Sequence, residues 1–306
     1  MNQIFSGLLI YSFAIFSMLF WGLSFVWTKI AFETYGPFTV VAVRMLVSGG
    51  FLWAISYLPL WRESIQRTDV RWFLLLGFFE PFCYFMGESF GLLEVSASVG
   101  ALVIATIPLF TTLLAPVLEK NQRVSPFAYF GATLSFLGVF LVIVDSNFDM
   151  QYSWHGIGYL FVAVAAAVGY NIVTRKLSSR YKPITIVKVQ NSLGFLFFLP
   201  FFLFFEWHSF VTIVPSMRAV GSIVALTIFA STLAFLMYVF LLARIGMVRS
   251  NMFTNLIPIF ASVFSWLVLN ESFDARKIVG MACILAGVVL SQFRKPTLLL
   301  SMVEGG

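Results

Sequence analysis

The sequence predicts an all-α membrane protein with ten transmembrane helices, arranged as two inverted five-helix repeats. Three observations predict this fold. The chain has 306 residues, of which 60% are hydrophobic and only 10% charged, whereas a soluble domain carries about 25% charged residues. Ten apolar stretches follow one another, most of them near the roughly 20 residues that a spanning helix needs. Motifs in the first half recur in the second. This composition excludes a sizeable extramembrane domain and a large soluble active site.

The ten predicted helices are separated by short connections. They run over residues 8–31, 37–58, 71–92, 96–118, 125–144, 156–176, 184–205, 219–242, 249–269 and 275–293. Each is too long and too uniformly apolar for a strand of a membrane barrel, which alternates over about ten residues. No small-residue cleavage site follows a basic start, so we expect the first helix to be retained rather than removed as a signal peptide.

Lys and Arg in the loops predict the orientation, because basic residues concentrate on the cytoplasmic side. One set of alternate loops carries thirteen of them: Arg62, Arg67, Arg71, Lys120, Arg123, Arg175, Lys176, Arg180, Lys182, Arg244, Arg249, Arg294 and Lys295. The other set carries four: Lys29, Arg218, Arg276 and Lys277. We therefore expect a multi-pass protein of the cell inner membrane with both termini cytoplasmic. The net charge of +6 needs no nucleic-acid partner.

An internal repeat divides the chain into residues 1–148 and 149–306. At a constant offset of 146 residues, matching residues in 21–40 and 167–186 include two Thr pairs, a Tyr pair and a Pro pair. Further on, ATIPLF at 105–110 matches TNLIPIF at 254–260, around Pro108 and Pro258. Because each half holds five spans, the second half is inverted in the membrane. Inverted repeats are typical of transporters, in which similar halves exchange the side that is open.

The motifs resemble those of a known family. The chain resembles the EamA-type exporters of the drug/metabolite transporter superfamily in WGLSFVWTK at 21–29, GPFTVVAVRMLVSG at 36–49 and ALVIATIPLFTTLLAP at 101–116. Residues 251–290 resemble the same family. The resemblance spans about residues 10–293 and implies ten helices, a central cavity and export of small metabolites such as amino acids. One departure is visible: the first half offers Gln122 or Glu119 where the second half has Glu271.

Ionisable residues inside the spans are functional candidates, because a buried charge in a membrane is costly. Arg44 lies seven residues into the second span, roughly 10 Å deep at 1.5 Å per residue, and Glu88 lies at a similar depth on the third. Either these two form a structural ion pair, or Arg44 faces a cavity and binds a carboxylate or phosphate. Gln190 occupies the repeat position of Arg44 and is also expected to face the interior.

The third span carries the most suggestive group of polar residues. Glu80, Tyr84 and Glu88 are spaced four apart and therefore share one helix face. Glu80 lies near the midplane and precedes Pro81, which should bend the helix. A carboxylate beside a bend suggests proton coupling, while the alternative is a neutral Glu80 bonded to a backbone carbonyl.

The other candidates are single residues. Trp21 is the aromatic residue best placed to line a cavity, and Asn171 and Asn255 either bind substrate or form interhelical hydrogen bonds. The candidates for gating are three prolines: Pro81, and also Pro108 and Pro258, which lie within the fourth and ninth spans. Each of these prolines allows either flexing or a static kink.

Taken with the resemblance, these features predict a secondary transporter that exports small metabolites, chiefly amino acids or related amphipathic compounds, by alternating access. The alternatives are a transporter of anionic metabolites such as sugar phosphates and an intramembrane enzyme. Enzyme motifs such as HExxH and GxSxG are missing from the sequence, so we expect no catalysis. With two cysteines, both in apolar stretches, and two histidines, both in loops, we expect neither a metal nor a cofactor. The substrate and the lipid bilayer are the expected partners, and the chain is either a monomer or a homodimer.

Overall fold

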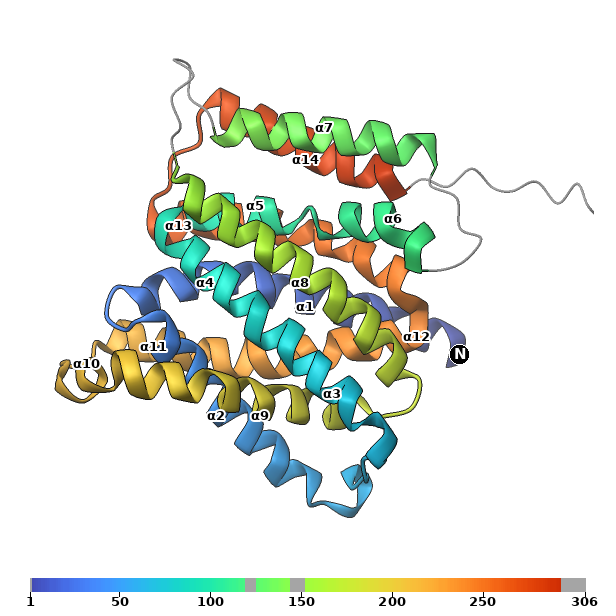
Figure 1. Cartoon of the computed structure of the whole chain (residues 1–306). Helices are drawn as coiled ribbons and strands as arrows, with labels where there is room; N and C mark the ends of the chain where they lie inside the picture. Colours follow the sequence, from blue (N-terminus) through green and yellow to red (C-terminus); the bar gives the residue numbers. More distant parts are fainter. Residues whose placement is uncertain (1, 119–124, 144–151, 293–306) are drawn as a thin grey trace, which may run out of the picture.

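The structure is a computed structural model that describes residues 2–118, 125–143 and 152–292. In these ranges it contains helices and no strands (Figure 1). The elements are α1 (Asn2–Phe32), α2 (Pro37–Ser56), η1 (Pro59–Trp61), η2 (Arg67–Asp69), α3 (Val70–Gly77), η3 (Phe78–Cys83), α4 (Tyr84–Glu94), α5 (Ala97–Ile104), α6 (Ile107–Leu118), α7 (Pro126–Ile143), α8 (Trp154–Ser178), α9 (Pro183–Phe201), η4 (Phe202–Glu206), α10 (Trp207–Thr212), α11 (Met217–Ala225), η5 (Leu226–Ala234), α12 (Phe235–Phe253), η6 (Thr254–Leu256), α13 (Ile257–Leu269) and α14 (Ala275–Gln292).

Seven helices or helix runs in the described part of the chain are long and apolar enough to cross a membrane. They are Leu9–Phe32, Pro37–Ser56, Ala97–Leu114, Trp154–Ser178, Pro183–Thr212, Met217–Gly246 and Ser250–Leu269. A shorter apolar helix covers Pro126–Val142. This is the architecture of an all-α multi-pass membrane protein, as the apolar stretches predict.

Several of the predicted helices are interrupted rather than continuous. The third stretch passes from α3 through the π-helical η3 into α4, and Glu80 within it has non-helical torsions (φ −146°, ψ 118°). Pro81 follows and has no N–H to donate, which explains a local break of the helix. The eighth stretch also contains a π-helical segment, η5, between α11 and α12. Gly246 interrupts α12 with φ 78°, a conformation that glycine adopts without steric cost.

Pro108 and Pro258 lie within the candidate spans Ala97–Leu114 and Ser250–Leu269, as expected, and each stands at the start of a new helix inside its span. Helix α5 ends at Ile104 and α6 starts at Ile107, so Pro108 is in the first turn of α6. Pro258 is likewise in the first turn of α13, after the 3-10 turn η6. The first turn is where a missing N–H costs least.

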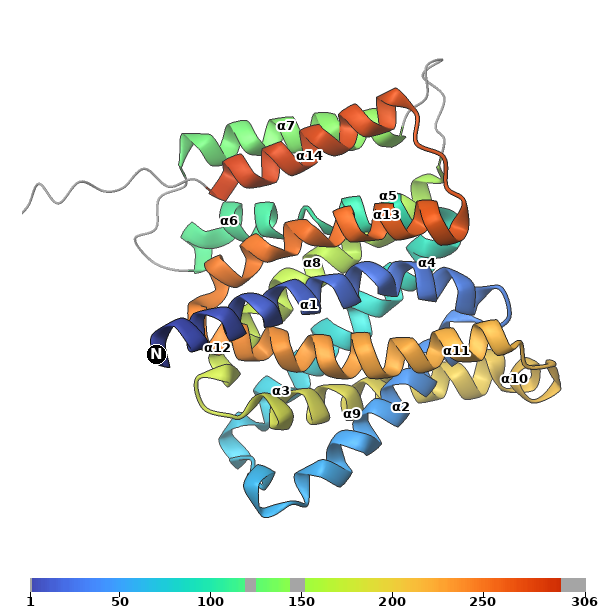
Figure 2. The same ribbon diagram turned by 180° about the vertical axis from the view of Figure 1, so that it is seen from behind.

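The helices pair across the two halves of the chain. Helices α2 and α9 pack together, as do α5 and α13 and also α7 and α14. Helix α4 packs on α8, and α1 packs on α11, η5 and α12. The α7–α14 pair lies along one side of the bundle in both views (Figures 1 and 2).

The α7–α14 pair is held at close range by glycines. A Cβ added to Gly138 would lie 2.7 Å from the backbone nitrogen of Ile284, and one added to Gly280 would lie 2.9 Å from the carbonyl oxygen of Gly138. Gly131 and Gly287 face each other in the same reciprocal way. Side chains at these positions would force the two backbones apart, so the four glycines allow this packing.

Glutamates join the two halves at the ends of helices. Glu206 accepts hydrogen bonds from the backbone nitrogens of Phe38 (3.2 Å) and Thr39 (2.7 Å) and from the Thr39 hydroxyl (2.7 Å), which caps the N-terminus of α2. At the opposite end of the bundle, Glu63 accepts from the backbone nitrogen of Lys182 at 3.0 Å, just before α9. Carboxylates stabilise helix N-termini, where backbone N–H groups lack intrahelical partners.

Glu271 makes a third such cap. Its carboxylate accepts from the backbone nitrogens of Ala97 (2.8 Å) and Ser98 (3.4 Å) and from the Ser98 hydroxyl. Lys277 approaches it to 3.8 Å. The glutamate that follows α13 in the second half therefore fixes the start of α5 in the first half. Glu119, the nearest acid of the first-half copy of this motif, lies outside the described residues.

Candidate functional site

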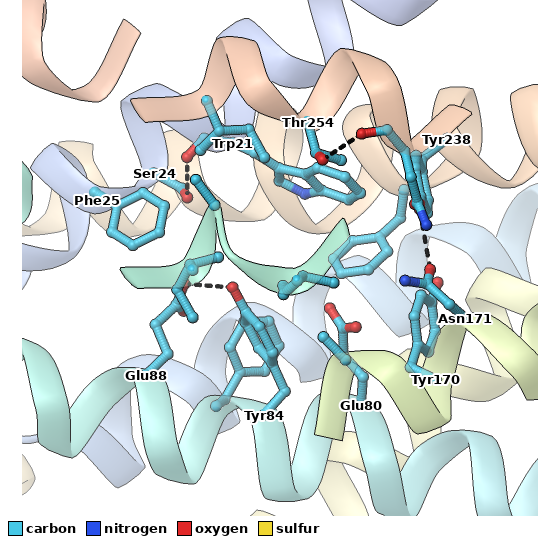
Figure 3. A pocket seen from close by; sticks show the side chains of 18 of the residues that line it. Trp21, Ser24, Phe25, Glu80, Tyr84, Glu88, Tyr170, Asn171, Tyr238 and Thr254 are labelled. Atoms are coloured by element: carbon cyan, nitrogen blue, oxygen red, sulfur yellow. Dashed lines mark hydrogen bonds between the residues drawn. The ribbon is translucent and has the colours of Figure 1, made fainter. Parts of the chain in front are cut away.

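A pocket lies in the middle of the bundle, between the two halves (Figure 3). The space between its walls, counted together with the open mouth, is about 660 Å³. It is lined by Trp21, Ser24, Phe25, Arg44, Glu80, Tyr84, Phe85, Glu88, Ile104, Ala105, Ile107, Ala167, Tyr170, Asn171, Phe235, Tyr238, Asn251, Thr254 and Ile257. Most of this wall is aromatic or aliphatic, and its few polar groups are the means of orienting a ligand.

One wall of the pocket is acidic. Glu80, Tyr84 and Glu88 project into it from η3 and α4, opposite Trp21 and Ser24 of α1 (Figure 3). The Tyr84 hydroxyl donates to Glu88 Oε1 at 2.9 Å. Both carboxylates are buried, with 6% of Glu80 and 5% of Glu88 exposed. The predicted stripe on the third helix is thus brought to one face of the pocket.

The positive charge of the pocket comes from Arg44 on α2, which is 3% exposed. Its Nε donates to Ser231 Oγ at 2.8 Å, and its Cζ lies 4.4 Å from the ring centre of Phe85. Among the described residues, no carboxylate oxygen lies within 4.0 Å of the guanidinium nitrogens. A direct ion pair between Arg44 and Glu88 is therefore not formed in this conformation, although Arg44, Glu80 and Glu88 line the same pocket.

The opposite wall consists of aromatic rings and amides. Trp21 packs edge-on against Phe235 and Tyr238, at ring-centre distances of 5.2 and 4.9 Å. The Tyr238 hydroxyl lies 3.0 Å from Asn171 Oδ1 and 2.6 Å from Asn251 Oδ1. A hydroxyl carries one proton, so it can donate to only one of these amide oxygens at a time.

The structure brings six of the eight predicted binding residues into the lining: Trp21, Arg44, Glu80, Tyr84, Glu88 and Asn171. Gln190 lies behind the wall, where its Oε1 accepts from the Tyr170 hydroxyl at 3.2 Å. Asn255 is not part of the lining. It lies in the 3-10 turn η6, whereas Asn251, which lines the pocket, lies in the last turn of α12.

The three prolines predicted to gate the site lie beside it rather than in it. Pro81 directly follows the lining residue Glu80 and packs against Gly194 of α9. Ile107 and Ile257, the residues that precede Pro108 and Pro258, both line the pocket. The helix breaks of the two halves therefore meet at the site.

Sequence reasoning missed several lining residues: Ser24, Phe85, Tyr170, Phe235 and Tyr238. With 37 Phe in the chain, no single phenylalanine stands out. The tyrosines carried a usable signal, because a phenol inside a membrane span needs a hydrogen-bond partner. Tyr170 stands next to Asn171 in the sequence, and both belong to the site.

Outside the spans, the end of the bundle opposite Glu206 has its own polar contact. Asp69 accepts from the Tyr181 hydroxyl at 2.9 Å and from Arg180 Nη1 at 2.9 Å. The hydrogen bond from Tyr181 and the charge of Arg180 together hold the pKa of the Asp69 carboxyl below its ordinary value. This contact joins the segment before α3 to the segment before α9.

Comparisons with known proteins agree with this geometry. The chain is 27% identical to "Uncharacterized transporter YcxC" of Bacillus subtilis, over 92% of this chain and 90% of that protein. It is 26% identical to "Probable terminal-alkyne amino-acid exporter" of Streptantibioticus cattleyicolor, over 90% of this chain and 91% of that protein. A solved crystal structure shares the fold at a TM-score of 0.66 and 15% identity, covering 92% of this chain and 96% of its own.

The sequence model of the EamA-like transporter family matches the chain twice, over residues 8–144 and 154–293. Together the two matches cover most of the sequence. The family, the relatives and the apolar helices agree on a multi-pass membrane protein that handles small molecules. The chain belongs to the EamA-like transporter family.

Proposed function

We propose that this protein is a secondary transporter that exports small amphipathic metabolites, chiefly amino acids, by alternating access around the central pocket. The observation that carries the proposal is the combination of both charge signs with aromatic walls in one buried pocket. A distant relative named as an amino-acid exporter supports the same substrate class.

The polar groups suit a zwitterion with an apolar body. Arg44 offers a carboxylate its terminal guanidinium nitrogens, while Glu80 and Glu88 offer an ammonium group two carboxylates. Trp21 and the neighbouring rings provide an apolar surface for the side chain. A dianion such as a sugar phosphate would meet two acids and a single arginine among the described lining residues, which favours the zwitterion.

We infer that the ten predicted helices form two inverted repeats, residues 1–148 and 149–306. The pattern of helix contacts supports this, because exchanging the halves leaves it unchanged: three helix pairs map onto themselves, and α4 on α8 maps onto α1 on α11–α12. The reciprocal caps made by Glu206 and Glu63 behave in the same way, and the family model matches each half separately. Such symmetry is what alternating access requires.

For the orientation, the loop charges support cytoplasmic termini in the inner membrane. Glu206 and Glu271 then cap helices on the outer side, and Glu63 and Asp69 lie on the inner side. Fusions of a reporter that is active only in the cytoplasm to the C-terminus test this assignment. An inactive reporter on a well-expressed fusion would contradict it.

Transport itself is tested with purified protein in proteoliposomes and a panel of labelled amino acids and their carboxyl-amides. We expect Arg44→Gln to lose transport of the acids while the protein still folds, and to affect the amides little. If Arg44 instead only balances Glu88, the double variant Arg44→Gln with Glu88→Gln should recover full transport, which would reject the binding role of Arg44.

A further inference from the structure

We propose that Ser231 is the positioning residue for Arg44: its hydroxyl fixes the guanidinium so that the two terminal nitrogens receive a substrate carboxylate end-on. Ser231 lies on the π-helical segment η5 and is not itself part of the pocket lining. This inference rests on the proposed function and deepens it, because it names the residue that prepares the carboxylate site.

The guanidinium has only one edge left for a ligand. Its Nε is engaged by Ser231 Oγ at 2.8 Å, and one of its faces is covered by Phe85 at 4.4 Å. Among the described residues, Nη1 and Nη2 of Arg44 have no hydrogen-bond acceptor. An arginine whose Nε is occupied binds a carboxylate through these two nitrogens, which form a fork of matching width.

Ser231 is held in place from the neighbouring helices. Its carbonyl oxygen accepts from Asn191 Nδ2 at 3.0 Å and lies 3.3 Å from Ser48 Oγ. Asn191 Nδ2 also donates to Ser48 Oγ at 2.7 Å. All three residues are fully buried. A π-helical segment departs from the regular hydrogen-bond ladder, and here the Asn191 side chain of α9 donates to the Ser231 carbonyl.

The direction of the neighbouring hydrogen bonds leaves Ser231 Oγ available as the acceptor for Arg44 Nε. Thr232 Oγ1 donates to the carbonyl of Thr227 at 2.7 Å, so its single proton is used. The 2.6 Å contact between Ser48 and Thr232 is therefore donated by Ser48. The protons of Asn191 go to Ser48 and to the Ser231 carbonyl. None of these donors occupies Ser231 Oγ, whose acceptor site is free for Nε.

Without this hydrogen bond, Arg44 has a competing position. Glu88 and Glu80 line the same pocket as Arg44, opposite charges attract, and an arginine side chain can change rotamer. Loss of the Ser231 hydroxyl should let the guanidinium move toward Glu88 and form the ion pair that the native geometry prevents. That pair would occupy the group that the substrate carboxylate needs.

The test compares Ser231→Ala with Ser222→Ala, which removes a buried hydroxyl from the preceding helix of the same run, where it bonds only to the Arg218 carbonyl. Binding of an amino acid and of its carboxyl-amide is measured on purified protein, together with thermal stability. We expect Ser231→Ala to weaken binding of the acid roughly tenfold, the low end for a hydrogen bond to a charged group, and to leave the amide within about twofold. Ser231→Cys, which keeps the volume but accepts hydrogen bonds weakly, should show the same selectivity.

A double-mutant comparison separates positioning from general destabilisation. In an Arg44→Gln background, Ser231→Ala should have no further effect on acid binding. Equal losses for acid and amide, or full loss in that background, would overturn the positioning role. Normal acid binding by Ser231→Ala beside weak binding by Arg44→Gln would overturn it while leaving the proposed function intact. Failure of the wild type to bind any acid of the panel would overturn both.

Discussion

The cap made by Glu206, on the side that we propose to face outward, should control how often the pocket opens on that side. Glu206→Gln keeps the size of the side chain and one acceptor oxygen, which can still serve Thr39. The new amide NH₂ faces the backbone N–H of Phe38, to which Glu206 now accepts at 3.2 Å. Both are donors, so this hydrogen bond is lost together with the charge at the N-terminus of α2. Loss of a helix N-terminal carboxylate and cap costs about 1–2 kcal/mol.

If the ends of α2 and η4 separate when the outer side opens, the closed state alone loses this energy. A change of about 1–2 kcal/mol shifts a two-state equilibrium by about 5–30-fold. The assay uses the lining position 105 as Ala105→Cys, in a background where Cys83 and Cys283 are serine. Labelling of intact cells by a membrane-impermeant maleimide should accelerate by a factor in that range.

The matched control is Glu33→Gln. Glu33 lies at the same end of the bundle and pairs with Arg218 at 3.4 Å, but both side chains are about half exposed. Exposed pairs contribute about 0–1 kcal/mol, so labelling should change little. Equal acceleration of labelling in both variants, or an unchanged labelling rate in Glu206→Gln, would refute the proposed control of opening by the Glu206 cap.

Three further predictions concern coupling, acid stability and packing. A proton gradient should accelerate wild-type transport in proteoliposomes and have no effect on transport by Glu80→Gln. Wild-type transport at the same rate with and without the gradient would refute proton coupling through Glu80. The folded-state pKa of Asp69 is lowered, so its carboxylate stabilises the protein above the ordinary pKa of about 4, and this stabilisation is lost as the pH falls through the lowered pKa. Thermal melts of Asp69→Asn should lack this loss of stability in acid. Identical pH profiles of melting temperature for the wild type and Asp69→Asn would contradict the prediction. Gly287→Ala places a Cβ 2.7 Å from the backbone nitrogen of Ser135 and should cost about 1–3 kcal/mol of stability, whereas Gly221→Ala, which meets nothing within 4 Å, should leave the melting temperature unchanged; equal melting temperatures would refute the close α7–α14 contact.

The helices could be predicted from the sequence because the bilayer allows few alternatives. An apolar run of about 20 residues in lipid must satisfy its own backbone hydrogen bonds, and a helix does so. Their interruptions could not be predicted in detail. In a π-helical segment such as η5 the backbone hydrogen bonds join residues five apart instead of four, and a hydrogen bond from Asn191 on α9 to the Ser231 carbonyl supports this segment.

The polar part of the candidate site was accessible to sequence reasoning, since Arg44, Glu80 and Glu88 are conspicuous in an apolar chain. The aromatic part was not, because any of the many phenylalanines can face lipid, a neighbouring helix or a cavity. Asn255 shows a third limit. Its spacing from Asn251 assumes a continuous α-helix, whereas Asn255 lies in the 3-10 turn η6, and of the two only Asn251 lines the pocket.

Transport through the pocket is tested most directly by the exchange of a labelled amino acid across proteoliposome membranes by two variants of α8. Ala167 lines the pocket, and Ala167→Phe fills it with a ring. Ala165 lies two residues away on the exposed face of the same helix, so Ala165→Phe adds the same ring on the outside. If substrate passes through this pocket, Ala167→Phe abolishes exchange and Ala165→Phe exchanges at the wild-type rate. Wild-type exchange by a well-folded Ala167→Phe would contradict it, because the substrate would then pass elsewhere.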